Sequence, residues 1–68
     1  MRKYQQLWEV VVQLTGSQPQ FHEVFFEGTS QEDISAKVKK HTDSFLEITA
    51  CMNVYGRRIG ELREIADN

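Results

Sequence analysis

A run of alternating apolar and polar side chains near the start of the chain constrains the fold most strongly. Residues 4–14 are rich in valine and aromatic residues, and a period of two in such a segment is typical of a β-strand. One face of the expected strand carries Tyr4, Gln6, Trp8, Val10, Val12 and Leu14. The other face carries Leu7, Glu9, Val11 and Gln13, so apolar side chains occur on both faces.

The next two segments predict a hairpin. Residues 15–20 combine glycine, proline and small polar residues, which favours a loop, and residues 21–27 predict a second strand. Its register stays open, because a shift by one residue exchanges the two faces of a strand. If Val24 shares the face of Val10, the opposite face receives Phe21, Phe25, Glu23 and Glu27.

A helix is expected after Gly28. The segment Thr29-Ser30-Gln31-Glu32 fits a capping box, in which Thr29 accepts from the third helical N–H and Glu32 reaches back. Acidic residues then open the helix and basic residues close it, which suits the helix dipole. The expected last turn contains Lys37, Lys39, Lys40 and His41. We therefore predict one helix of roughly 11 to 13 residues.

The C-terminal part of the chain predicts further strands. Residues 45–55 alternate, and we expect one face to pack under the helix. That face is Leu46, Ile48, Ala50, Met52 and Val54, and the other is Phe45, Glu47, Thr49, Cys51, Asn53 and Tyr55. Gly56-Arg57-Arg58 is expected to turn the chain, and residues 59–67 fit a fourth strand. A short helix bearing Ile59, Leu62 and Ala66 is the alternative, which Gly60 disfavours.

These elements predict a single α+β domain over residues 1–68. It consists of an antiparallel sheet of three to four strands with one helix on one face, in the order ββαβ or ββαββ. The charge balance of eight basic and ten acidic side chains argues against a dedicated nucleic-acid-binding protein. With Cys51 as the single cysteine, no intramolecular disulfide can form, and we expect a cytoplasmic protein. No apolar run approaches the ~20 residues of a membrane span.

The chain contains no motif that predicts catalysis. Gly56 and Gly60 are separated by three residues and are not followed by Lys-Ser or Lys-Thr, so they do not form a phosphate-binding loop. The candidate metal ligands His22, His41 and Cys51 lack the spacing of a zinc site. Local clustering of Cys51 and Ser44 with His41 and Asp43 does not define a catalytic triad. We expect no enzyme activity, no metal and no cofactor.

The apolar side chains on the second sheet face predict a protein contact. One helix covers one face, and an exposed apolar patch rimmed by charge often binds a protein. The candidate partner-binding residues are Leu7, Val11, Phe21, Phe25, Tyr55, Arg57 and Arg58, and Phe45 is also expected on this face. A homodimer through the same face and β-strand addition at a sheet edge are further modes. A nucleic-acid-binding domain is the alternative function, using Lys37, Lys39, Lys40, Arg57 and Arg58.

In size and layout, the chain resembles small phage and prophage proteins that modulate a host machine. These include inhibitors of host RNA polymerase, anti-CRISPR proteins and anti-restriction proteins. The resemblance rests on no motif and assigns no residue. It implies a stoichiometric inhibitor that binds a host macromolecular machine.

Overall fold

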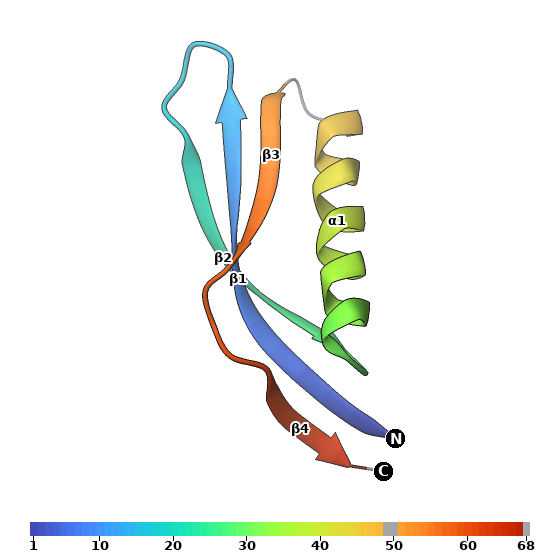
Figure 1. Ribbon diagram of the computed structural model, residues 1–68. Helices are drawn as coiled ribbons and strands as arrows, with labels where there is room; N and C mark the ends of the chain where they lie inside the picture. Colours follow the sequence, from blue (N-terminus) through green and yellow to red (C-terminus); the bar gives the residue numbers. More distant parts are fainter. Residues whose placement is uncertain (49–50, 68) are drawn as a thin grey trace.

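The computed structural model describes residues 1–48 and 51–67. Four strands and one helix follow in the order ββαββ within these residues, which confirms the predicted α+β class. The elements are β1 (Arg2–Leu14), β2 (Gln20–Gly28), α1 (Gln31–Ile48), β3 (Cys51–Arg58) and β4 (Arg63–Asp67). Figure 1 shows α1 running beside the sheet, with the two ends of the chain close together.

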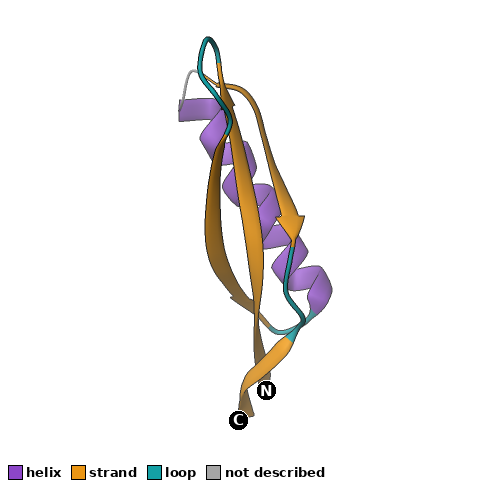
Figure 2. Cartoon of the chain, turned by 90° about the vertical axis from the view of Figure 1, so that its left-hand side faces the viewer, coloured by secondary structure: helices purple, strands orange, loops and turns teal. Residues whose placement is uncertain are grey.

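Strand β1 is the centre of the sheet, and every other strand pairs with it in the antiparallel sense. Strand β2 lies along one edge of β1. Strands β3 and β4 share the other edge, with β3 opposite residues 8–14 and β4 opposite residues 2–5. The molecule is therefore long and narrow, 46 × 20 × 13 Å (Figure 2). Its radius of gyration of 13.3 Å exceeds the about 11 Å expected for a compact domain of this length.

The register of the hairpin follows from burial. Trp8 lies opposite Val24, and Val11 lies opposite Phe21. The even-numbered residues of β1 face the helix, and Val10, Val12 and Val54 form the buried core on that side. Ile34 and Val38 of α1 are buried as well, and the core is flanked by Leu14, Val24, Phe26 and Phe45. Phe21 and Phe25 therefore lie on the face away from the helix.

The helix is longer than the sequence predicted, which corrects the expected strand at residues 45–55. Residues 45–48 belong to α1, and β3 begins only at Cys51. The physical reason is Phe45, which lies seven residues after Val38 and continues its helical stripe. Phe45 packs against the core cluster, and it does not lie on the open side of the sheet. Leu46 is exposed on the helix, and the side chains of Ile48, Ala50 and Met52 lie outside the described part.

The longer helix also moves the predicted basic end. Lys37, Lys39, Lys40 and His41 lie in the middle of α1, and its last turn contains no basic residue. His41 contacts the rings of Phe26 and Phe45, at 5.5 Å and 5.7 Å between ring centroids. It therefore packs at the edge of the core, where the sequence had suggested a cation at the helix C-terminus.

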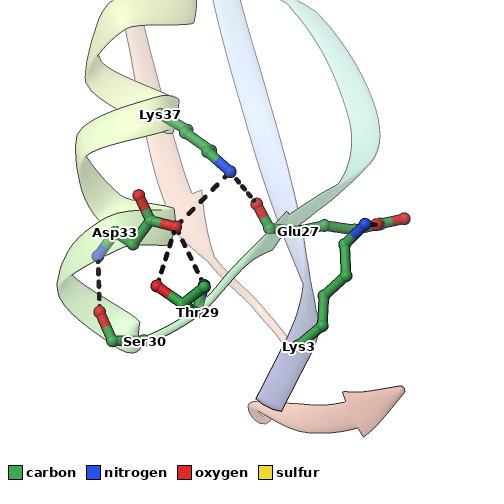
Figure 3. Close-up of polar contacts among 6 residues, drawn as sticks. All are labelled: Lys3, Glu27, Thr29, Ser30, Asp33 and Lys37. Carbon is green, nitrogen blue, oxygen red and sulfur yellow. Dashed lines mark hydrogen bonds and ion pairs between the residues drawn. The ribbon is translucent and has the colours of Figure 1, made fainter. Parts of the chain in front are cut away.

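The helix cap is Ser30, one residue later than predicted (Figure 3). Ser30 Oγ accepts a hydrogen bond from the Asp33 N–H at 3.1 Å, and Asp33 Oδ2 accepts from the Thr29 N–H at 2.9 Å. Asp33 takes the role that had been expected for Glu32. Lys37 Nζ lies 3.5 Å from Asp33 Oδ2 and donates to the carbonyl oxygen of Glu27 at 2.8 Å. These contacts tie the start of α1 to the end of β2.

Gly56 does not turn the chain, contrary to the prediction. Gly56-Arg57-Arg58 belongs to β3, and the chain turns over residues 59–62. A Cβ atom at Gly56 would collide with the side chain of Val38 and touch the Trp8 ring. Glycine at this position therefore allows α1 to approach the sheet closely. Among the described residues, only Gly16 has a positive φ, of 76°, in the loop between β1 and β2.

A buried amide joins the separate parts of the fold. Gln6 is 2% exposed. Its Nε2 donates to Gln31 Oε1 at 3.0 Å and to the carbonyl oxygen of Gly60 at 3.1 Å. Its Oε1 accepts from Trp8 Nε1 at 2.9 Å and from Gln31 Nε2 at 2.8 Å. The hydrogen-bonding capacity of the Gln6 amide is thus filled, and it connects β1, the first residue of α1 and the segment between β3 and β4.

Replacing Gln6 by leucine should lower the free energy of unfolding by about 1–3 kcal/mol, because it leaves buried donors and acceptors without a partner. Urea unfolding measures this loss. The control is Gln13→Leu, since Gln13 Oε1 only accepts a long bond of 3.5 Å from the exposed Asn53 amide. A loss as large in Gln13→Leu as in Gln6→Leu would contradict the importance of the network.

Asp33 should make the stability of the fold dependent on pH. The Thr29 N–H, followed by the charge of Lys37, holds the pKa of the Asp33 carboxyl below its usual 3.8. The folded state therefore favours the carboxylate, and its contribution is complete above pH 3.8 and is lost as the pH falls below it. Asp33→Asn should lower the melting temperature at neutral pH, and the difference from wild type should shrink in acid. Glu32→Gln, in the same turn, is the control and should not reproduce this convergence.

Candidate protein-interaction surface

The sheet face away from α1 gathers most of the predicted partner-binding residues. We call it the open face and define it by residues of β1, β2 and β3, namely Leu7, Glu9, Val11, Phe21, Glu23, Phe25, Tyr55 and Arg57. Their pairings place them in three rows that run across the strands. Two apolar rows enclose one charged row.

The first apolar row crosses all three strands. Val11 of β1 lies opposite Phe21 on one side and opposite Tyr55 on the other. Phe21 is 63% exposed, whereas Val11 between the two rings is only 2% exposed. Val11 is therefore shielded from water on the face opposite α1, at a position flanked by Phe21 and Tyr55 on the neighbouring strands. The row presents two aromatic side chains to a partner.

The second apolar row pairs Leu7 with Phe25, which is 59% exposed. On the other side of Leu7, the chain passes from β3 to β4, and the N–H groups of Ile59 and Gly60 both donate to the Leu7 carbonyl oxygen. A depression of about 200 Å³ opens here, lined by residues that include Leu7, Phe25 and Gly60. This row thus combines an exposed ring with a shallow hollow.

The charged row lies between them and is unbalanced. Arg57 Nη2 lies 3.1 Å from Glu9 Oε1, and the Glu9 side chain is 19% exposed. Glu23 lies directly opposite Glu9 on β2. Like charges in this position destabilise a strand pair, and no ion pair to Glu23 occurs within the described part of the chain. The row therefore ends in an unpaired carboxylate at the β2 edge.

The structure separates the remaining candidate residues from this face. Arg58 lies opposite Trp8, whose ring approaches Gly56 on the helix side, so Arg58 lies away from the open face. Phe45 belongs to α1. Sequence reasoning missed Glu9 and Glu23 as a cross-strand pair, because their juxtaposition depends on the register. It also missed the exposed side chains of Ile59, Leu62 and Ile65.

The cations of the nucleic-acid alternative do not form one surface. Lys37 and Lys39 lie beside carboxylates of their own helix, with Lys39 Nζ 2.8 Å from Asp43 Oδ2. The hydrogen bond from Lys39 to Asp43 raises the pKa of Lys39. Arg57 is paired on the open face and Arg58 lies on the other side, while Lys40 is exposed on α1.

Of the residues considered for catalysis or metal binding, His41, Ser44 and Asp43 make structural contacts. Ser44 Oγ donates to the Lys40 carbonyl oxygen at 2.9 Å, and Asp43 pairs with Lys39. His22 is exposed on β2, whereas His41 belongs to α1. The Cys51 side chain lies outside the described part. The described residues contain no group of three or more histidine, cysteine or acidic side chains suited to a metal ion. They also include no helix of the length and apolarity that a membrane crossing requires.

Comparison of the chain with protein-family models, with curated proteins and with solved structures gives no match. The geometry of the open face is therefore the basis for assigning a function.

Reversing the charge of Glu23 should stabilise the isolated protein. In Glu23→Lys, the repulsion from Glu9 becomes an attraction, and the free energy of unfolding should rise by up to about 1 kcal/mol. Added salt should reduce the gain by screening. Glu27→Lys is the matched control, because Glu27 is paired with Lys3 at 3.0 Å and its reversal removes an attraction. Destabilisation by Glu23→Lys in urea unfolding would contradict the unbalanced row.

Proposed function

We propose that this protein is a non-catalytic protein-binding module that contacts its partner through the open face. The observation that carries the proposal is the exposure of Phe21 and Phe25 on a sheet face that no helix covers. Aromatic side chains are enriched in protein interfaces, and exposed apolar surface next to polar residues often marks a protein-interaction site.

The row pattern suits a specific interface. The two apolar rows would supply the hydrophobic contribution to binding, because a partner would remove their apolar surface from water. The charged row between them would orient the partner, because electrostatic complementarity contributes more to specificity than to affinity. Glu9 and Glu23 also lie on this face and would repel a phosphate backbone, which supports a protein rather than a nucleic acid as the partner.

The resemblance to phage proteins that modulate host machines extends this proposal. A stoichiometric binder without catalytic groups would act by occupying a surface that its target needs. We propose inhibition of a host macromolecular machine as the biological consequence of binding. An activity assay of any captured target, with the protein added in increasing molar ratio, tests this part, and inhibition should be complete near equimolar amounts.

Substitution of Phe25 by glutamate should abolish capture of the partner. Phe25 is exposed, so the change should leave the fold intact, which circular dichroism can check. Immobilised wild-type protein and the variant are incubated with cell lysate, washed at high salt, and compared by mass spectrometry. The control is Leu46→Glu, which changes an exposed apolar residue on α1 and should retain the wild-type set of proteins.

Three results would count against the proposal. Retention of the same proteins by Phe25→Glu would remove the open face as the binding surface. Nucleic acid that binds the protein and is released by salt would favour the lysine and arginine surfaces instead. A wild-type protein that captures nothing but doubles its hydrodynamic mass would identify a homodimer.

A further inference from the structure

The outer edge of β2 is not paired with another strand in the described part of the chain. Within the described residues β2 pairs only with β1, and the register of this nine-residue strand runs without interruption. By contrast, the pairings of β1 with β3 and with β4 each contain a register shift. Proteins usually protect an edge with charged side chains, especially lysine, with proline or with a bulge. β2 contains no lysine, proline or bulge, and its charged residues are the acidic Glu23 and Glu27, which disfavour an acidic strand but not a basic one. Such an edge is a template for another strand.

The helix limits this edge at one end. The Lys37 ammonium donates to the Glu27 carbonyl oxygen, as Figure 3 shows, so α1 already occupies the end of β2 next to Gly28. In Figure 1, no other element lies beside the upper part of β2 on the side away from β1, whereas its lower end leads to the start of α1. The edge is therefore open along the part of β2 that carries Phe21, Glu23 and Phe25.

An added strand would extend the three rows of the open face by one residue each. Next to Phe21 and Phe25, the extension of the apolar rows favours apolar side chains. Next to Glu23, the charged row lacks a cation, because Arg57 balances only the side toward β3. A lysine or arginine here would pair with Glu23 as Arg57 pairs with Glu9. It would relieve the repulsion between the two carboxylates.

We propose that the β2 edge binds an extended segment of a partner protein by β-strand addition, with a basic residue beside Glu23 and apolar residues two positions before and after it. The proposal rests on the function proposed above and names the chemistry of the partner. Backbone hydrogen bonds would supply affinity, and alternate side chains would supply specificity.

A segment of another protein suits this edge better than a second copy does. Two β2 strands paired about Glu23 would bring two identical carboxylates together. The residues of β2 on the open face, Phe21, Glu23 and Phe25, include no cation that could balance them. The basic residues Arg57 and Arg58 lie on β3, so they are not part of such a β2–β2 pair. A β2–β2 pair of two copies therefore brings no cation beside Glu23.

Charge reversal provides the test. The probes are two fluorescent peptides, Thr-Val-Thr-Lys-Thr-Val-Thr and the same peptide with glutamate in place of lysine. Wild-type protein should bind the lysine peptide about fivefold to tenfold more tightly, from the cross-strand charge energies. Glu23→Lys should reverse the preference. Glu47→Lys, which makes the same change of net charge on α1, should leave the preference as in wild type.

A second readout locates the added strand. Binding of the lysine peptide should slow amide hydrogen exchange in β2 and leave β3 unchanged. Methylation of alternate peptide nitrogens on the edge-facing side should abolish binding, because it removes backbone donors. Failure of the wild-type protein to bind the lysine peptide, an unreversed preference in Glu23→Lys, or protection of β3 instead of β2 would each overturn strand addition at β2.

The outcomes separate this inference from the proposed function. If the peptides do not bind but capture from lysate still depends on Phe25, only strand addition at β2 fails. If capture does not depend on Phe25 but Glu23→Lys reverses the peptide preference, the open face is not the binding surface. Strand addition at the β2 edge is then still supported. Self-association that requires both Glu23 and Arg57 would overturn the choice of a partner protein over a second copy.

Discussion

The fold depends on the buried amide of Gln6. Its four hydrogen bonds join the central strand β1 to the start of α1 and to the segment between β3 and β4. A buried polar group is costly unless its hydrogen bonds are satisfied. The network therefore specifies one arrangement of these parts, which the few apolar residues of the core would define less sharply. Trp8 takes part through its indole N–H, while its ring covers Gly56.

The small size of the domain explains why one sheet face is open. A domain of this length buries a limited fraction of its surface, and its single helix lies on one side of the sheet. The other side is stabilised only by contacts between neighbouring strands, as the shielded Val11 shows. It also retains a repulsive pair, Glu9 and Glu23, that costs stability in the isolated protein. Natural sequences retain such locally unfavourable features mainly at functional sites, which is consistent with a binding role for this face.

The amino-acid sequence predicted those parts of the fold in which local pattern and burial agree. The alternation in residues 4–14 identified β1. The sequence also offered Leu7, Val11, Phe21, Phe25 and Tyr55 as candidates for one apolar surface, but it left open the hairpin register that brings them onto one face. Prediction was wrong where two periods fit the same residues: Phe45 continues both a strand alternation and the helical stripe of Val38, and packing against the core decided for the helix. Gly56 suggested a turn, but its role is close packing. The charged row could not be predicted, because opposition of Glu9 and Glu23 depends on the register.

The pairing of β1 with β4 has a mechanical consequence. Arg2 lies opposite Asp67 at the far end of an antiparallel pair, so both free ends of these strands emerge on the same side of the molecule (Figure 1). A pulling force applied at these two residues would load the backbone hydrogen bonds one after another, because it acts across the strands rather than along them. The pair would open like a zipper at low force up to Leu7, where two N–H groups hold a single carbonyl oxygen. Tension in an attached chain would thus detach β4 from β1 first, before it reached the part of β1 from Leu7 onward that bears the open face.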